Sequence, residues 1–462
     1  MPLPTTFAGD SARGEGLFAS TISLGSGYWA ATLTDAYTTP SDVGNGITID
    51  SSGNVYVCGY GSGSSGNQNA SVSKYNSSGT IQWQTTLSGA GSNNNANGIT
   101  VDSSGNVYVC GSMQDYPSTG NQTAIVSKYN SSGTLLWQQT LYPSSGTISA
   151  WAYGITTDSS GNVYVCGRSA TVNLIYKLNS SGTIQWQKKL DDGQSPKIKI
   201  LYFYGIVIDN SGNLYVCGNN YNSALVPVIT VAKYNSSGTL LWQNSLTDNA
   251  GTPNDIGRGI AIDSSANVYV VGFGYNSSSA FVGSISKWNS SGTLQWQRTM
   301  TDTYSGPSDF LYGISIDSSD NLFVTGGGLN ASGQPIISIS KWNSSGTLQW
   351  QRTINDTNSA PNDVGKGITV DSLGNLYVTG QITNKAGNLV MFIAKLPSDG
   401  SRTGTYSNST FGIVYASSSW TAATSTWTAA TTSYTDATST LTSATPSFTN
   451  SASTWTTSLV AL

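Results

Sequence analysis

The side chains that most often carry chemistry are scarce in this chain. None of its 462 residues is a histidine, which removes the commonest general base and the commonest transition-metal ligand together. Ser-His-Asp catalysis and zinc hydrolysis are therefore excluded. Arginine occurs six times, at positions 13, 168, 258, 298, 352 and 402. We expect a protein that is not an enzyme and that has no catalytic residue, no cofactor and no metal.

Four cysteines stand at the same place in successive copies of one short motif: Cys58, Cys110, Cys166 and Cys217. Later copies carry Val271, Thr325 and Thr379 there. Equivalent points of stacked sheets lie about 10 Å apart. This separation exceeds the Cα limit of roughly 7 Å for a disulfide. We interpret the cysteines as small buried apolar side chains rather than redox groups or ligands.

Asp and Asn recur in two polar motifs, D-S-S-G-N and N-S-S-G-T, which a turn explains better than a ligand does. One carboxylate per loop is a poor site for Ca²⁺, which takes six or more oxygens. The side chain can instead cap the backbone N–H groups of a hairpin loop, in which Gly supplies the left-handed residue. The N-S-S tripeptides also match glycosylation acceptors, and the turn accounts for all six: Asn76, Asn130, Asn179, Asn235, Asn289 and Asn343.

The first of these motifs belongs to a repeat that spans most of the chain. The segment D-S-S-G-N-V-Y-V-C-G or a close variant starts at Asp50, Asp102, Asp158, Asp209, Asp263, Asp317 and Asp371. The second motif follows each of the first six copies and ends in a tryptophan: Trp83, Trp137, Trp186, Trp242, Trp296 and Trp350. A repeat of about 50 residues is typical of propellers and other repeat architectures.

Each repeat contains four short segments rich in Val, Ile, Thr, Tyr and Trp, separated by turn residues. In the first repeat they are GITID, NVYVCG, SVSKY and TIQWQTTL. The sequence therefore predicts four-stranded antiparallel sheets. Sheets that cannot bury their own faces become stable when they stack radially. We expect an all-β, seven-bladed β-propeller, with each fourth-strand tryptophan wedged against the neighbouring sheet.

The two ends of the repeat region predict how the ring closes. The seventh repeat lacks its fourth strand, because Gly404 stands where the tryptophan is expected. The segment GYWAATL at residues 27–33 supplies the missing pattern, with Trp29 in the tryptophan position. We expect this N-terminal strand to complete blade seven. The predicted domains are an N-terminal arm at 1–26, the propeller at 27–406 and a tail at 407–462.

The signals D-x-x-G-N-x-Y-V-x-G and G-I-x-[VI]-D resemble the β-propeller repeats called SBBP, which are related to the NHL type. The resemblance covers residues 28 to about 406. Propellers serve as enzymes, adhesins and scaffolds, so this resemblance implies a fold rather than an activity.

Two enzyme families also show partial likeness. The stretch NSSGTLQW resembles the structural turn of sialidases, whose chemistry needs an arginine triad that the six arginines do not evidently form. It also resembles the tryptophan-docking motif of quinoprotein dehydrogenases, but it is one residue shorter, and those enzymes resemble eight-bladed rings. Neither likeness favours an enzyme.

The composition restricts the kinds of partner and cellular location that we expect for the chain. Charged residues make up 9% of the chain and its net charge is -4, with no basic run. We therefore expect no nucleic-acid surface, because such surfaces need clustered Lys and Arg. No apolar stretch is long enough for a membrane span. The N-terminus lacks a basic start followed by an apolar segment, so we expect no ordinary signal peptide.

The loops on one face differ between repeats, and varied loops on a rigid scaffold suit recognition. The residue before the Gly of each innermost strand is expected to ring the channel mouth on that face. These residues form a possible shallow site for a sugar or a peptide, or they plug the channel and pack on one another. They are Asn45, Asn97, Tyr153, Tyr204, Arg258, Tyr312 and Lys366. Trp151, Tyr202 and Phe203 lie beside them and are expected to enlarge the patch.

After residue 406 the chain becomes a Ser/Thr/Ala-rich tail with large apolar residues seven positions apart: Trp420, Trp427, Tyr434, Leu441, Phe448, Trp455 and Leu462. A heptad suggests a helical seam. Ser and Thr are mediocre helix formers and Pro446 interrupts the pattern, so an extended strand or fibre-like repeat is the alternative. In either form we expect the tail to anchor or oligomerise the protein through a protein partner.

The tail resembles those on virion proteins of marine and cyanobacterial tailed phages. We therefore expect a non-enzymatic structural and recognition protein displayed on a larger assembly, a phage virion, where it meets host glycan or neighbouring virion proteins. A homo-oligomer is possible, and no membrane insertion is expected. The alternatives are a bacterial cell-surface or extracellular carbohydrate-binding propeller and, more weakly, a glycan-processing enzyme.

Overall fold

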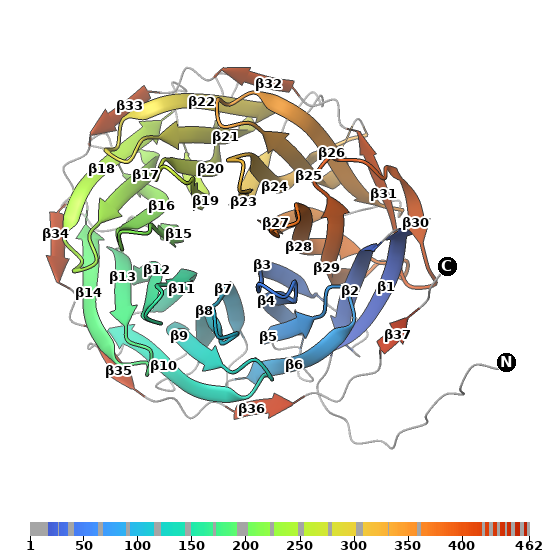
Figure 1. The fold of residues 1–462 in the computed structure, drawn as a ribbon, viewed down its shortest axis with the longest axis horizontal. Helices are drawn as coiled ribbons and strands as arrows, with labels where there is room; N and C mark the ends of the chain where they lie inside the picture. Colours follow the sequence, from blue (N-terminus) through green and yellow to red (C-terminus); the bar gives the residue numbers. More distant parts are fainter. Residues whose placement is uncertain are drawn as a thin grey trace.

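The computed structural model is an all-β ring (Figure 1). It describes residues 17–25, 27–35, 41–62, 68–88, 93–114, 122–143, 149–169, 172–191, 202–221, 226–247, 254–275, 280–301, 308–330, 332–357, 362–417, 421–424, 428–431, 435–438, 441–444, 449–452 and 457–459. Within these ranges there is no helix, and hence none long and apolar enough to cross a membrane.

Seven antiparallel blades surround the channel, each with four strands from the inside outward. The innermost strands of blades one to seven are β3 (Val43–Ile49), β7 (Asn95–Val101), β11 (Ala150–Thr157), β15 (Tyr202–Ile208), β19 (Ile256–Ile262), β23 (Phe310–Ile316) and β27 (Val364–Val370). The second strands are β4 (Val55–Ser62), β8 (Val107–Gln114), β12 (Val163–Ser169), β16 (Leu214–Tyr221), β20 (Val268–Tyr275), β24 (Leu322–Leu329) and β28 (Asn375–Thr383).

The outer half of each blade has the same regularity. The third strands are β5 (Gln68–Tyr75), β9 (Gln122–Tyr129), β13 (Val172–Leu178), β17 (Pro227–Tyr234), β21 (Phe281–Trp288), β25 (Pro335–Trp342) and β29 (Leu389–Pro397). The fourth strands are β6 (Ile81–Ser88), β10 (Leu135–Pro143), β14 (Ile184–Asp191), β18 (Leu240–Thr247), β22 (Leu294–Thr301), β26 (Leu348–Asp356) and, in blade seven, β2 (Tyr28–Asp35). The predicted seven-bladed fold and its closure by the N-terminal strand are confirmed.

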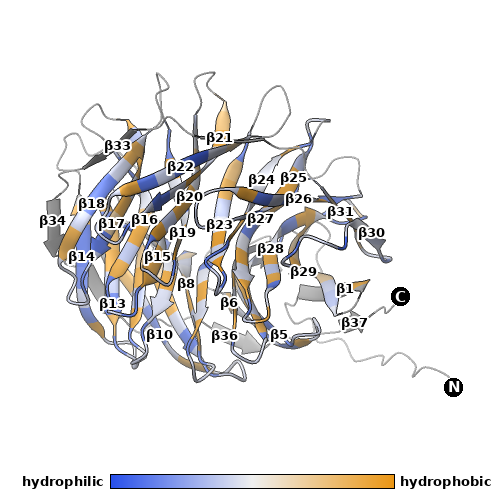
Figure 2. Cartoon of the chain, turned by 45° about the horizontal axis from the view of Figure 1, so that its top comes forward, coloured by the Kyte–Doolittle hydropathy of each residue, from blue (hydrophilic) through white to orange (hydrophobic). Residues whose placement is uncertain are grey.

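The core lies between the blades. Seven clusters of buried apolar side chains each join one sheet to the next. In one of them, Tyr56 and Val72 of blade one pack with Val107 and Val109 of blade two. Figure 2 shows hydrophobic residues along β21 and hydrophilic residues on β22 at the rim. Because these apolar faces are buried against the neighbouring sheets, we expect no single blade to be stable without its neighbours.

The four cysteines belong to these layers. All are buried and none forms a disulfide. Burial raises the pKa of the Cys58 and Cys217 thiols to about 12, so both thiols stay neutral at physiological pH. Neutral buried thiols are poor nucleophiles and poor metal ligands, which agrees with their interpretation as small apolar side chains.

A tryptophan of each fourth strand docks on the next blade. The Nε1 of Trp83 donates a 3.0 Å hydrogen bond to the backbone O of Ser131. Its ring covers Gly133, where an added Cβ would lie 2.7 Å from Trp83 Cδ2. The same bond, 3.0 to 3.2 Å long, occurs at all seven junctions: Trp29 to Ser77, Trp83 to Ser131, Trp137 to Ser180, Trp186 to Ser236, Trp242 to Ser290, Trp296 to Ser344 and Trp350 to Ser398. The predicted wedge is confirmed.

Two separate constraints, backbone conformation and contact with the indole, require glycine at the positions under these rings. Gly133 has a φ of +84°, which an L side chain adopts only with strain, and it also lies under the indole. The turn thus gives both the hairpin geometry and a flat receptor for the tryptophan. The turn motif therefore shapes the outer hairpin of its own blade and also binds the tryptophan of the preceding blade.

Additional strands outside the expected boundaries extend the sheets of blades six and seven. β1 (Leu17–Gly25) pairs with β2 in blade seven, where an arm was expected at 1–26. β30 (Gly404–Ser407) and β31 (Gly412–Ser417) form a hairpin, and β31 pairs with β26 in blade six. Ile22, Leu24, Phe411 and Ile413 are buried in the same cluster. Neither β1 nor β31 carries the repeat motif, and both extend a propeller sheet beyond the expected limits at 27 and 406.

The tail encircles the ring as a series of short strands (Figure 1). β32 (Thr421–Thr424), β33 (Thr428–Thr431), β34 (Thr435–Thr438), β35 (Leu441–Ala444) and β36 (Thr449–Ala452) pair antiparallel with the fourth strands of blades five, four, three, two and one in turn. β37 (Thr457–Leu459) pairs parallel with β1. We call β31–β37 the belt.

The seven-residue spacing of the tail equals one step from blade to blade. In four blades, the fourth-strand residue two positions after the tryptophan pairs with a belt residue, and these belt residues are seven positions apart. The pairs are Ser417 with Arg352, Thr424 with Arg298, Thr431 with Asn244 and Thr438 with Lys188. The extended alternative is therefore observed and the helical seam is not, within the described part of the tail. Trp420, Trp427, Tyr434, Phe448, Trp455 and Leu462 lie outside the described residues, and the backbone of Leu441 pairs with Pro143.

Replacing a docking glycine should cost more than the strain of positive φ alone. Gly133→Ala places a Cβ against the Trp83 ring, whereas Gly387→Ala has a similar φ of +82° and no heavy atom within 4 Å of the new Cβ. The left-handed strain of about 1–2 kcal/mol is common to both. Crowding should add about 1–3 kcal/mol in Gly133→Ala alone. Thermal unfolding followed by circular dichroism tests this, and equal losses in the two variants would contradict the docking argument.

Removing residues 418–462 should leave the ring folded and expose its outer edges. The seven apolar clusters and all seven tryptophan contacts lie within residues 17–417. Backbone N–H groups of β6, β10, β14, β18 and β22 lose their belt partners and should exchange hydrogen faster. β26 keeps its partner β31 and is the internal control. Hydrogen exchange by mass spectrometry that shows no difference between β26 and the other five strands would contradict the role of the belt.

Candidate functional site

All seven residues predicted to ring the channel mouth are the extra residues of β-bulges. In β3, Gly44 pairs with Gly59 and Gly46 pairs with Cys58, so Asn45 has no partner of its own. The register skips the equivalent residue in each other innermost strand. A bulge bends its strand and re-aims one side chain. All seven side chains are half-buried. We call Asn45, Asn97, Tyr153, Tyr204, Arg258, Tyr312 and Lys366 the mouth residues.

A glycine on the second strand makes room for each bulge. At Gly59 an added Cβ would lie 1.9 Å from the backbone O of Val43. The equivalent glycine in every other blade has a backbone oxygen of the bulged strand at 2.0 Å or less. The final Gly of the V-Y-V-x-G signal is therefore required by the bulge. In every repeat, the same glycine of the second strand thus allows the bulge that positions the variable side chain of the innermost strand.

One side of the mouth is polar. Asn45 Nδ2 donates to the backbone O of Ala96 at 2.9 Å, and Asn97 Nδ2 donates to the O of Ala152 at 2.8 Å. Lys366 Nζ donates to Asn45 Oδ1 at 3.4 Å and so connects blades seven and one. These amides hold adjacent innermost strands together at the rim of the channel.

The opposite side begins with aromatic rings of blades three and four. The ring centroids of Tyr153 and Tyr204 are 5.0 Å apart, and Tyr202 stacks on Tyr204 at 4.9 Å with an interplanar angle of 10°. The Arg168 guanidinium lies 3.8 Å from the Trp151 ring centroid and 4.4 Å from that of Tyr202. Cation–π contacts of this kind fix both the cation and the rings.

A second group of aromatic rings lies on blades five and six. Phe273 is buried and contacts Phe281 and Phe310 at centroid distances of 5.6 and 4.7 Å. Tyr275 stacks on Phe281 at 4.3 Å. Arg258 joins the two groups, with its guanidinium 4.0 Å from the ring centroid of Tyr204. We call the partly exposed rings of both groups the aromatic crescent: Trp151, Tyr153, Tyr202, Tyr204, Tyr275, Phe281, Phe310 and Tyr312.

The mouth tyrosines are neutral hydrogen-bonding groups. Burial raises the pKa of Tyr153 to about 12, despite the opposing charge of Arg168. Burial also raises the pKa of Tyr204 and of Tyr312, against the charge of Arg258. Neutral phenols next to planar rings can both stack on a ligand and hydrogen-bond to it.

Below the mouth an apolar ring of residues lines the channel. Seven Gly-Ile pairs, one from each innermost strand and beginning with Gly46 and Ile47, line a cavity of about 180 Å³. The glycines allow neighbouring strands to approach, because a Cβ at Gly98 would lie 2.7 Å from the backbone O of Tyr153. A ligand at the mouth would therefore have a hydrophobic floor beneath it.

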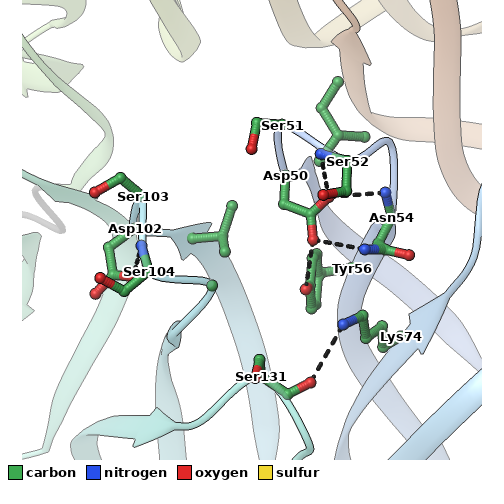
Figure 3. Close-up of a pocket in the computed structure, with 13 residues that line it drawn as sticks. Asp50, Ser51, Ser52, Asn54, Tyr56, Lys74, Asp102, Ser103, Ser104 and Ser131 are labelled. Atoms are coloured by element: carbon green, nitrogen blue, oxygen red, sulfur yellow. Dashed lines mark hydrogen bonds between the residues drawn. The ribbon is translucent and has the colours of Figure 1, made fainter.

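The opposite face carries a polar cavity of about 470 Å³ between blades one and two (Figure 3). Lys74 Nζ donates to the backbone O of Ser131 at 3.2 Å and lies 5.1 Å from the Tyr56 ring centroid. Asp50 Oδ1 accepts from the N–H groups of Ser52 and Asn54 at 2.9 Å. Asp50 Oδ2 accepts from Tyr56 Oη at 2.9 Å.

These polar groups are engaged with each other, and the arrangement recurs in other blades. The pKa of Asp50 is lowered, because hydrogen bonds from Asn54, Tyr56 and Ser52 outweigh the effect of its partial burial. Asp102, Asp158, Asp209 and Asp263 show the same balance. The turn-capping interpretation of D-S-S-G-N is confirmed, and this cavity belongs to the scaffold.

Two buried carboxyl groups fix the start of β27, which carries Lys366. Asp363 Oδ2 accepts from the Asp356 N–H at 2.7 Å, and Thr383 N–H donates to Asp363 Oδ1 and to Asp356 Oδ2 at 3.1 Å each. Burial, and then the charge of Asp356, raise the pKa of Asp363. The raised pKa favours the protonated form of Asp363, as is usual for a buried carboxyl group next to another carboxyl group.

The structure places the seven predicted residues at equivalent bulges of the innermost strands, and sequence reasoning missed part of their surroundings. Phe203 does not enlarge the patch, because it is buried between blades three and four, on the other side of its strand from Tyr202 and Tyr204. Arg168 was not singled out, although it pairs directly with Trp151 across two strands. The only signal for it was its place at the end of the second strand, one residue after the invariant glycine.

The carboxyl pair makes a pH-dependent contribution to stability. An unfolded Asp has a pKa of about 3.9. The native pKa of Asp363 is higher, so native stability should fall as pH rises from about 4 through that raised value, by about 1.4 kcal/mol for each pH unit that separates the native pKa from the unfolded one. Asp363→Asn removes this ionisation. Thermal midpoints between pH 4 and 8 should converge or cross in favour of the variant as pH rises, and parallel curves would contradict this assignment.

Four segments of the chain match a family model described as a β-propeller repeat (SBBP). They are residues 36–67, 82–112, 145–173 and 357–385, and each covers all or most of the two innermost strands of one blade. No curated protein sequence matches this chain.

Solved structures give general likeness only. A protein of unknown function from Bacteroides caccae is 15% identical, with a TM-score of 0.37, over 61% of this chain and 89% of its own. One from Dyadobacter fermentans is 10% identical, with a TM-score of 0.39, over 82% and 98%. A rhamnogalacturonan lyase is 11% identical, with a TM-score of 0.33, over 81% of each chain. Likeness at this level carries no argument. The four repeat matches and the seven observed blades together show a β-propeller fold built from sequence repeats.

Proposed function

We propose that this propeller is a non-enzymatic recognition protein that binds glycan at the channel mouth and is displayed on a larger assembly, a phage virion. The observation that carries the binding proposal is the aromatic crescent. Its partly exposed rings gather beside one opening of a rigid ring, at positions set by bulges. Sugar rings present C–H faces that pack on aromatic faces, and their hydroxyl groups pair with phenols and amides.

The contrast between the two faces also supports recognition. The turn face repeats one hydrogen-bonded arrangement around the ring, with Asp50, Asp102 and Asp158 in the same role. The mouth presents four kinds of side chain over the seven blades: two Asn, three Tyr, one Arg and one Lys. Function that depends on particular residues is expected where a rigid scaffold carries varied groups. The mutual packing of the mouth residues is compatible with a ligand site, because packing holds the exposed edges in place.

A non-enzymatic role is supported by the state of the carboxyl groups. Glycoside hydrolysis usually needs two carboxyl groups on either side of an accessible substrate bond. The pair formed by Asp356 and Asp363 is buried and accepts backbone hydrogen bonds. The five turn carboxylates with lowered pKa are held by their own loops. A glycan-processing enzyme remains the weaker alternative.

The virion is proposed from the tail, whose composition resembles that of tailed-phage virion proteins. Partner proteins would meet the outer edge of the belt, because its inner edge already pairs with blades one to six. A bacterial cell-surface or extracellular carbohydrate-binding propeller is the alternative. Neighbouring terminase and tail genes would favour the virion, and their absence beside the gene would favour the bacterial surface.

A glycan array tests the binding proposal directly. We expect Tyr204→Ala to weaken binding about 3- to 10-fold, since an aromatic contact contributes about 0.5–1.5 kcal/mol. Leu373→Ser is the matched control, because Leu373 is 86% exposed on a turn of the opposite face. Thermal unfolding of both variants separates loss of a contact from loss of the fold. Absence of any glycan signal, or equal binding by the two variants, would overturn the proposal.

A further inference from the structure

Three cations gather at the channel mouth, and none of them forms an ion pair with a carboxylate in the described part of the chain. Arg168, Arg258 and Lys366 come from blades three, five and seven. The contacts of the two guanidinium groups are with aromatic rings, and Lys366 contacts the Asn45 amide. Among the residues that the structure describes, an ion pair at 3.6 Å joins Lys287 to Asp263, and it lies on the turn face rather than at the mouth. The chain as a whole has a net charge of -4, so this local excess of positive charge runs against its composition.

The charges of these cations influence the same group of side chains at the mouth. The charges of Arg168 and Arg258 both influence Tyr153 and Tyr204. Burial and then the charge of Arg258 lower the pKa of Lys366 to about 8. Two further atoms are buried and lack a hydrogen-bond partner: Nε of Arg168 and Nε of Arg258. Cations held together in partly desolvated positions are unfavourable unless an anion accompanies them.

The groups around the cations also restrict which kind of ligand can bring an anion to the mouth. The cavity below the mouth is lined by seven Gly-Ile pairs, which offer no side-chain hydrogen bond to a polar chain passing through the channel. Rings for stacking lie beside the cations on the surface, with Tyr202 and Tyr204 stacked at 4.9 Å next to both arginines. A ligand that stacks on the crescent would therefore direct one terminal negative group toward the centre of the mouth.

We propose that the mouth binds the carboxylate of a terminal acidic sugar, with Arg258 and Lys366 as its main partners and the aromatic crescent under the sugar ring. This inference rests on the proposed glycan function and names the class of glycan. Arginine suits the role because its planar guanidinium donates two parallel hydrogen bonds to a carboxylate. Arg168 adds charge from the side of Trp151.

The test measures binding of the full chain to matched pairs of oligosaccharides that end in glucuronic acid or in glucose. A second pair, with and without terminal N-acetylneuraminic acid, distinguishes uronates from sialates. We expect the acidic member of at least one pair to bind at least 10-fold more tightly at low salt. Its advantage should shrink as ionic strength rises.

Variants connect that preference to the mouth. Arg258→Gln should weaken binding of the acidic glycan at least 5-fold more than binding of its neutral partner, and Lys366→Gln should act in the same direction. Arg402→Gln is the control for net charge, because Arg402 is exposed on a turn outside the mouth. Thermal unfolding shows whether each variant is folded, and Lys366→Arg should retain the preference.

The possible outcomes separate the two proposals. Equal binding of acidic and neutral glycans that still depends on Tyr204 would overturn the acidic-sugar inference and leave glycan recognition standing. An acidic preference that Arg402→Gln reduces as much as Arg258→Gln would also overturn it, because the effect would then be one of overall charge. Absence of binding to every glycan would overturn both.

Discussion

The contact between a fourth-strand tryptophan and the next blade is the interaction on which the rest of this structure depends. The indole N–H finds a backbone carbonyl and the ring covers a glycine, so the aromatic group is paired at its polar edge and packed on its face. The contact joins sheets that share no strand, and it uses only groups that the repeat always supplies. Ring closure depends on the same contact. Trp29 of the N-terminal strand docks on blade one, and Trp350 docks on blade seven at Ser398, where the turn has the sequence P-S-D-G instead of N-S-S-G.

A scaffold fixed in this way leaves one position per blade free to vary. The bulge opposite the V-Y-V-x-G glycine turns a single side chain toward the channel mouth, and the strand pairing on both sides of it stays intact. The residue there can be Asn, Tyr, Arg or Lys without a change in register. The asymmetry of the mouth, with amides on one side and rings and guanidinium groups on the other, follows from seven independent choices at equivalent backbone positions. Variation is confined to a place where it does not disturb the docking contacts.

The sequence predicted the parts of this molecule that repeat and missed those that do not. Seven copies of one motif and six of the other were enough to predict the blades, the turn caps and the closing strand with Trp29. The strands β1 and β31 were missed because they carry neither motif, although Ile22 and Phe411 become core residues. Phe203 was assigned to the surface because neighbours along a strand were treated as neighbours in space, whereas successive side chains point to opposite faces. Arg168 approaches Trp151 only through cross-strand pairing, which composition does not reveal.

The tail shows why a period alone does not specify a conformation. A seven-residue spacing is the sign of a coiled coil when helical residues fill it, and here Ser and Thr fill it instead. The same spacing suits a strand that must meet an equivalent edge at every blade. Four paired residues and a short connector can span at most about 24 Å when fully extended. Ser417, Thr424, Thr431 and Thr438 accordingly face equivalent partners on successive blades. The count of seven was therefore set by the geometry of the ring, and the unpaired edges that seven outer strands would otherwise present are covered by the chain's own end.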